Sequence, residues 1–325
     1  MAAACAAIPA APSGQAVWDC AYAALPARRR TLERRLLPAL HAPLGKRGRA
    51  ARVAIDCHRV AYFGGPNRDT TRAKSAAGTH TFHTYATACV VGGPGRYALG
   101  RTAVGEEEPF TAVLTRLLDQ VAGAGVAVRV VLLDEAFFSI AVMRLLRSRN
   151  LPFVIPAVIR GRKPRIGAKV VGLRAVRCRG AGRYAYTHED RGVSVRVTVV
   201  VAHKSYRHRK TGRRHARKRL YATWRVGGTP VAVRDVYRTR FGVESRDRQL
   251  GQVRPRTSAT SGVIRLLWVA VGLILRNARV RFGAGSGSRW TLAAACPAVL
   301  AEVLVAGPDE RLAAAPTHRH ASPPT

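Results

Sequence analysis

Acidic residues are scarce in this sequence. Its 325 residues include 18 Asp and Glu against 55 Lys and Arg, giving a formal net charge of +37. Such an excess repels itself and attracts polyanions, so we expect a nucleic-acid partner ahead of a membrane surface. Lysine is scarce as well, since 48 basic residues are Arg, which binds phosphate bidentately and stacks on bases. The alternative interpretation is nonspecific adhesion or a ribosomal-type role.

Paired cysteines, a signal peptide and a membrane span are also lacking. The six cysteines form no Cys-x-x-Cys pair, and none lies at zinc-finger spacing from a histidine. The N-terminal stretch MAAACAAIPAAPSGQ has no charged start and is interrupted by prolines. The most apolar run, SGVIRLLWVAVGLILRNA, contains Arg265 and is shorter than the roughly 20 apolar residues that span a bilayer. We therefore expect reduced, mostly buried thiols, a cytoplasmic protein, and a buried core helix from Gly262 to about Arg279.

Residues 51–159 predict the first part of a single core. The segments RVAIDCHRVAYF, THTFHTYATACVV and RYALGRTAV are typical of three antiparallel strands, joined at Gly- and Pro-containing turns. PFTAVLTRLLDQVAGAG has helical periodicity, VAVRVVLLDEAF predicts a buried strand, SIAVMRLLRSRN a helix and PFVIPAV a fifth strand. This order is that of a ribonuclease-H-like domain, so the predicted fold class is α/β, a mixed sheet flanked by helices.

The other segments complete the predicted organisation. Residues 1–50 are expected to form a helical N-terminal region, either DNA-contacting or truncated. Residues 160–229 carry many Lys and Arg but only two acids, and predict a β-rich basic insertion before the helix that carries Glu244. Its expected strands are VVGLRAVRCRG, RYAYTHE, VSVRVTVVVAHKSY and KRLYATWRV. Residues 230–282 predict helices that complete the core, and 283–325 a C-terminal extension with a disordered tail.

Two isolated acids lie in apolar strands of this core. Asp56 is in VAIDCH, and Asp134 follows VVLL in the fourth strand of the predicted order. A buried carboxylate is costly unless it is paired or binds a metal, so both are candidate metal ligands. The alternatives are an ion pair between Asp56 and Arg59, and a helix-capping role for Asp134. Glu135 is the runner-up ligand, although on a strand it points to the opposite face.

The stretch YRTRFGVES adds a third acid. Tyr237, Arg240 and Glu244 fall on one face of a helix because they are spaced by three and four residues. Asp, Asp and Glu on strand, strand and helix is the layout of a two-metal phosphoryl-transfer site. Asp235 and Asp247 compete with Glu244. The alternative for Tyr237 and Arg240 is a stacked pair that faces solvent.

On these residues the chain resembles the DDE transposases of prokaryotic insertion sequences, in particular the family named after insertion sequence number four. That family has a ribonuclease-H-like core, a β-rich insertion before its last acid, and the signature Tyr-x2-Arg-x3-Glu-x6-Lys. Tyr237, Arg240 and Glu244 match the signature, whereas Gly251 stands where the family has Lys. Arg248 or Arg254 is the candidate substitute.

The resemblance implies a function and a set of partners. Asp56, Asp134 and Glu244 would bind two Mg²⁺ ions, which Mn²⁺ could replace, to cleave transposon ends and transfer strands to target DNA. Tyr237, Arg240 and Arg248 would hold DNA near the cut. The expected partners are the transposon inverted repeats, target DNA and a second copy of the chain on paired ends. The alternatives are a nuclease of the same fold without strand transfer, and a catalytically decayed DNA-binding relic.

A basic loop is expected between the last two strands of the insertion. It runs from Arg207 to Arg219 and carries the candidate phosphate contacts Arg209, Lys210, Arg213 and Arg214. Such contacts give affinity without reading sequence. The alternative is a solvated loop with no defined register. Trp224, just beyond it, either stacks on a base or is buried in the insertion.

Overall fold

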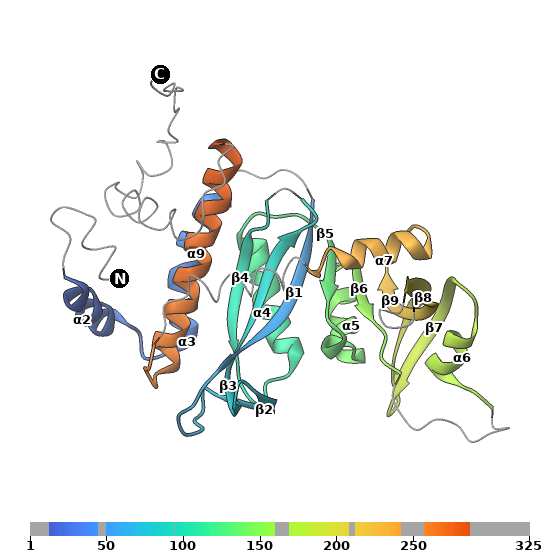
Figure 1. The fold of residues 1–325 in the computed structure, drawn as a ribbon, viewed down its shortest axis with the longest axis horizontal. Helices are drawn as coiled ribbons and strands as arrows, with labels where there is room; N and C mark the ends of the chain where they lie inside the picture. Colours follow the sequence, from blue (N-terminus) through green and yellow to red (C-terminus); the bar gives the residue numbers. More distant parts are fainter. Residues whose placement is uncertain are drawn as a thin grey trace.

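The computed structural model describes residues 13–44, 50–93, 95–159, 169–207, 212–241 and 257–286. They form one nine-stranded mixed sheet with helices on both faces (Figure 1). The elements in chain order are α2 (Gly14–Ala24), α3 (Arg29–His41), η1 (Ala42–Leu44), β1 (Ala51–Ala61), β2 (Thr71–Ala76), β3 (Thr79–Val91), β4 (Ala98–Val104), α4 (Phe110–Gly123), β5 (Val128–Leu133), η2 (Glu135–Phe137), α5 (Ile140–Ser148), β6 (Phe153–Pro156), α6 (Gly172–Cys178), β7 (Gly182–Asp190), β8 (Val193–Arg207), β9 (Arg214–Trp224), α7 (Pro230–Arg238) and α9 (Gly262–Ser286).

The strand order confirms the predicted core. Along the sheet the strands are β2-β3-β1-β5-β6-β9-β8-β7, and β4 also pairs with β3. β1 pairs antiparallel with β3 and parallel with β5, and β5 pairs parallel with β6. Three antiparallel strands (β1, β3, β4), helix α4, strand β5, helix α5 and strand β6 follow one another as the sequence predicts. β2, a short strand on the edge of β3, is an addition that the sequence analysis did not identify.

The central strands are apolar on both faces because both faces are covered. On β5, Val131 and Leu133 belong to the core under α4 and α5, whereas Val130 and Leu132 belong to the core under α3, α7 and α9. This double burial explains the continuous apolar run of β5. Helix α9 lies beside α3 at one end of the molecule (Figure 1), and its buried apolar residues confirm the predicted core helix.

The predicted insertion continues the core sheet. β9 pairs antiparallel with β6, from Phe153 opposite Trp224 to Pro156 opposite Tyr221, and β8 and β7 follow outward. The segment expected to begin this region as a strand is instead helix α6. Leu173 and Val176, three residues apart, are its buried side chains, so helical periodicity prevailed over the strand-like composition.

Much of the expected basic loop is also strand. β8 extends to Arg207 and β9 begins at Arg214, and the two pair from Thr198 opposite Thr223 to Arg207 opposite Arg214. The expected loop from Arg207 to Arg219 is therefore wrong at Arg207 and from Arg214 to Arg219, which are strand. Arg213 is exposed immediately before β9, and Arg209 and Lys210 lie outside the described residues.

The expectation of mostly buried thiols is wrong for two of the four described cysteines. All four are free of disulfides; Cys20 and Cys178 are exposed, Cys57 is half-buried and Cys89 is buried. Within the described ranges, no helix is both long and apolar enough for a membrane span.

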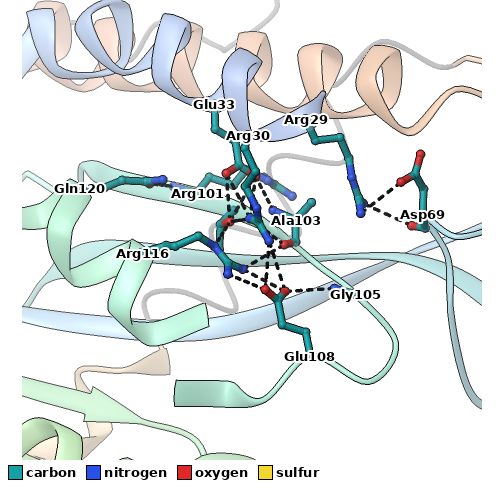
Figure 2. Close-up of polar contacts among 11 residues, drawn as sticks. Arg29, Arg30, Glu33, Asp69, Arg101, Ala103, Gly105, Glu108, Arg116 and Gln120 are labelled. Carbon is teal, nitrogen blue, oxygen red and sulfur yellow. Dashed lines mark hydrogen bonds and ion pairs between the residues drawn. The ribbon is translucent and has the colours of Figure 1, made fainter. Parts of the chain in front are cut away.

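Helix α3 is fixed to the sheet by a shared set of carboxylates and arginines (Figure 2). The buried Glu33 accepts hydrogen bonds from the backbone N–H of Ala103 at 2.7 Å and from the Thr102 hydroxyl at 3.1 Å. Arg30 pairs with Glu33 at 3.2 Å and with Glu108 at 3.0 Å, and Glu108 also binds Arg116. Despite partial burial, these arginines and the backbone N–H of Gly105 hold the pKa of Glu108 below its usual range.

Removing Glu33 is predicted to weaken this attachment. Glu33→Ala leaves the buried N–H of Ala103 without its acceptor and removes one partner of Arg30, whose own exposure moderates the cost. We expect a loss of about 2 kcal/mol in the free energy of unfolding, measured by urea denaturation. The control is Glu107→Ala, an exposed acid immediately before Glu108, expected to change stability by less than about 0.5 kcal/mol. Equal effects of both substitutions on the free energy of unfolding would contradict the role of Glu33 in attaching α3 to the sheet.

Candidate active site

The parallel pairing of β1 and β5 places the two candidate acids side by side. The last paired residues are Ile55 and Leu133, so the next residue on each strand is an aspartate, Asp56 and Asp134. Side chains alternate along a strand. Since Ile55 and Leu133 face α4 and α5, Asp56 and Asp134 face the opposite side of the sheet, where α7 packs.

The guanidinium of Arg240 lies between these carboxylates. Its Nη1 is 2.9 Å from Oδ2 of Asp56, and its Nη2 is 3.4 Å from Oδ1 of Asp134. Arg240 is almost fully buried, while the side chains of Asp56 and Asp134 are 15% and 37% exposed. Each acid thus contacts one arm of the same planar cation, a geometry that suits Arg better than Lys. Asp134 is the solvent-accessible member of the pair.

Helix α7 determines where Arg240 lies. The Thr229 hydroxyl accepts a hydrogen bond from the N–H of Ala232 and caps the helix, and Pro230 occupies its first turn. One turn apart, Val233 and Tyr237 are buried against the sheet. The ring of Tyr237 lies 5.1 Å from that of Tyr221 on β9, so the insertion supplies the surface on which α7 packs.

Arg240 follows the helix in a turn. Its N–H donates to the carbonyl of Tyr237 at 2.9 Å, and its guanidinium lies 5.7 Å from the centre of the Tyr237 ring. The spacing predicted that Tyr237 and Arg240 lie on one continuous helix. This prediction is wrong for the described residues, because α7 ends at Arg238. The alternative of a solvent-facing stacked pair is also wrong, since both side chains are buried.

Burial dominates the electrostatics of the site. It raises the pKa of Asp56 above the ordinary value of 3.8; the Arg240 charge opposes this shift, and the neighbouring Asp134 carboxylate adds to it. The backbone N–H of Cys57 donates to Oδ1 of Asp56 at 2.9 Å and also favours the ionised form. Burial likewise raises the pKa of the Tyr237 hydroxyl, so Tyr237 stays neutral.

The alternatives for the two acids do not hold in the described residues. Asp56 pairs with Arg240, and no ion pair joins it to Arg59 there. Asp134 precedes η2, but its side chain makes no capping hydrogen bond to that helix. Glu135 is exposed in η2.

The remaining predicted residues are divided between surface positions and undescribed segments. Asp235, a competitor of Glu244, pairs on the surface of α7 with Arg234 at 3.1 Å. Arg214 begins β9. Outside the described residues lie Glu244, Asp247, Arg248, Gly251 and Arg254.

The described donor set is compatible with a magnesium site. Mg²⁺ prefers oxygen ligands and is held in proteins by one or two carboxylates together with water. Asp56 and Asp134 supply such oxygens on adjacent strands, around a position that already attracts a cation, the Arg240 guanidinium. Among the described residues no group of three or more His, Cys, Asp or Glu gathers around a point. The predicted third acid, Glu244, is outside them.

The sequence analysis missed how Arg240 is used. It was predicted to contact DNA, and nothing in its spacing indicates a contact with residues 184 positions earlier in the chain. The available signal was indirect, because two neighbouring carboxylates in a partly buried position favour a cation between them.

Replacing Asp56 by Asn is predicted to stabilise the fold at neutral pH. The pKa of Asp56 is higher in the folded than in the unfolded chain, so its ionisation opposes folding above that pKa. As pH falls through the folded pKa the carboxyl is protonated in the folded state, and the cost declines until pH is below 3.8, where the carboxyl is protonated in both states. We expect Asp56→Asn to raise Tm by roughly 2 °C or more at pH 7, with the difference narrowing towards pH 4.

Differential scanning fluorimetry from pH 4 to pH 8 measures this effect. Asp119→Asn is the matched control, because Asp119 is 59% exposed and pairs with Arg149 on the surface. A lower Tm for Asp56→Asn than for the wild type at pH 7 would show that the Arg240 pair outweighs burial.

The fold is similar to that of a known transposase. A cryo-EM structure of the piggyBac transposase synaptic complex with hairpin DNA matches with a TM-score of 0.53 and 15% sequence identity. The match covers 86% of this chain and 57% of the piggyBac chain, so this chain spans less than two thirds of that protein. No protein-family model and no curated protein matches the sequence. The likeness gives no support to the narrower resemblance to the family named after insertion sequence number four. What it shows is that the fold of this chain, a ribonuclease-H-like mixed sheet flanked by helices, is similar to the fold of that protein.

Proposed function

We propose that this protein is a DNA transposase that cleaves transposon ends and joins them to target DNA with the help of divalent metal ions. The observation that carries the proposal is the pair Asp56 and Asp134, side by side on adjacent strands and facing one guanidinium. The fold likeness to piggyBac transposase and the net charge of +37 support it. A carboxylate pair that serves stability alone is seldom buried beside a like charge.

In this proposal Asp56 and Asp134, with Glu244, hold two Mg²⁺ ions, which Mn²⁺ can replace. Two such ions would neutralise charge on the attacking and leaving oxygens of the phosphoryl transfer. Asp56, in the middle of a paired strand, is the rigid ligand, and the more exposed Asp134 faces incoming DNA. The surrounding positive charge would attract the phosphate backbone and make binding strongly salt-dependent.

Arg240 has two positions in the proposed cycle. Before metal binding its guanidinium neutralises Asp56 and Asp134, as in the structure. If bound divalent cations supplied that charge, the guanidinium would be available to donate to the scissile phosphate. Arg chemistry suits both roles, because carboxylate and phosphate both accept its paired N–H groups. The DNA contact predicted from the sequence and the carboxylate contact in the structure would then belong to successive states.

Loss of either acid is predicted to abolish cleavage. Supercoiled plasmid incubated with the purified protein and Mg²⁺ or Mn²⁺ should be nicked, and Asp56→Ala or Asp134→Ala should reduce the rate by more than about a hundredfold. Asp235→Ala is the matched control, because Asp235 is a surface acid on α7 paired with Arg234. Equal nicking by wild type and both variants would sink the proposal.

Joining is tested separately. A labelled duplex with a free 3′-hydroxyl at its end, mixed with a target plasmid, gives strand-transfer products from a transposase and none from a nuclease. Absence of both cleavage and joining, with DNA still bound, would favour the catalytically decayed relic.

Arg240 is predicted to compete with metal for the acid pair. Arg240→Ala removes the cation that the metal must displace, so Mn²⁺ should bind about tenfold more tightly and raise Tm more than in the wild type. Mn²⁺ electron paramagnetic resonance measures the affinity, and thermal unfolding with and without Mn²⁺ measures the shift. Arg238→Ala is the control, an arginine on the same helix that is 66% exposed. Weaker Mn²⁺ binding by Arg240→Ala would contradict the competition.

A further inference from the structure

A basic groove lies on the face of the sheet that α4 and α5 cover, opposite the face of Asp56 and Asp134. A groove of about 650 Å³, here named the Trp224 groove, is formed where the end of α5 meets the turn between β7 and β8. It is lined by Arg144, Arg147, Ser148, Gly192, Val193, Ser194, Val195 and Trp224. None of these residues takes part in the acid site.

Trp224 forms the aromatic wall of the groove. It is the last residue of β9, paired with Phe153, and is only partly buried against the core under α5. The guanidinium of Arg225 lies 4.6 Å from the centre of its ring, and that of Arg147 lies 5.7 Å away. The predicted burial of Trp224 is therefore only partial, since the ring packs on the core and also lines the groove.

The charges of the two arginines of α5 are not neutralised by a carboxylate in the described residues. Arg144 is exposed, and Arg147 donates to the backbone carbonyl of Arg196 at 2.9 Å, a contact that leaves its charge uncompensated. No ion pair joins either arginine to a carboxylate in the described chain, and that includes Glu189 and Asp190 at the nearby turn. Arg30, Arg116 and Arg240, in contrast, all pair with carboxylates. Two uncompensated guanidiniums in one groove favour an anionic ligand.

The groove is separate from the acid site in space. Trp224 packs with the core under α4 and α5, together with Val197 and Val199 of β8. Asp56 and Asp134 face the opposite side, with Tyr237 and the core under α7. Trp224 also pairs with the start of β6, whereas Asp134 follows the end of β5, the parallel neighbour of β6. DNA bound at the acids therefore approaches another face of the sheet.

We infer that the Trp224 groove binds a single-stranded segment of nucleic acid. Arg144 and Arg147 contact successive phosphates, and an unpaired base stacks on Trp224 or on the Arg225 guanidinium that extends it. Unpaired bases are required because the base faces of a duplex are already covered by their neighbours. This surface goes beyond the proposed function, since it needs neither the acids nor a metal.

The test is binding of a fluorescein-labelled oligothymidylate of about 16 nucleotides, measured by fluorescence anisotropy in EDTA. Trp224→Ala should weaken binding at least about fivefold, and Trp224→Phe, which keeps an aromatic face, should recover most of it. Arg144→Gln with Arg147→Gln should lower the slope of log K against log salt by about 1.4, two phosphate contacts at about 0.7 each.

The control double variant is Arg34→Gln with Arg129→Gln. It removes the same charge from exposed arginines on α3 and β5, away from the groove. Equal weakening by both double variants, unchanged binding by Trp224→Ala, or equal sensitivity to Trp224→Ala with duplex DNA would each overturn the inference. Because binding is measured in EDTA, metal-dependent cleavage does not contribute, so failure of the groove and failure of the acid site are told apart.

Discussion

The pairing of β6 with β9 is the contact on which the rest of the structure depends. It joins two halves of the chain that are separated by more than fifty residues, and it makes β7, β8 and β9 part of the core sheet. Tyr221 on β9 then provides the surface that receives Tyr237 of α7. The turn after α7 in consequence delivers Arg240 to Asp56 and Asp134. Without this pairing the acids would remain adjacent, but their cation would have no defined position.

Because carboxylates are scarce in this chain, each of the partly or fully buried ones binds several donors. Glu33 and Glu108 hold Arg30, Arg116 and backbone N–H groups of β4 and its following loop, and so attach α3 to the sheet. Asp56 and Asp134 are different, because they share one cation and repel each other. In the Glu33 and Glu108 arrangement the carboxylates are paired with arginines. In the Asp56 and Asp134 arrangement the pKa of Asp56 is raised, which is typical of functional sites.

Local sequence patterns predicted the elements whose structure depends on the periodicity and apolar character of neighbouring residues. The apolar run of β5 ending at Asp134, and Asp56 within β1, identified two strands, and their parallel register followed from the fold class. The strand assignment failed at α6, where the two buried residues Leu173 and Val176 are too few to distinguish a helix from a strand by periodicity. The contact of Arg240 with Asp56 was not predictable, since it depends on the β6–β9 pairing and not on the neighbours of either residue.

The outer edge of β7 affects how this chain behaves when it is concentrated. β7 pairs with β8 along one side, and across the described residues no strand covers its other side. Such an edge presents backbone N–H and C=O groups to which a strand of another molecule can add. A net charge of +37 opposes that approach, but over a range of only about 8 Å at physiological ionic strength. High salt screens this charge over a still shorter range, so it removes the repulsion that keeps the β7 edges of two molecules apart.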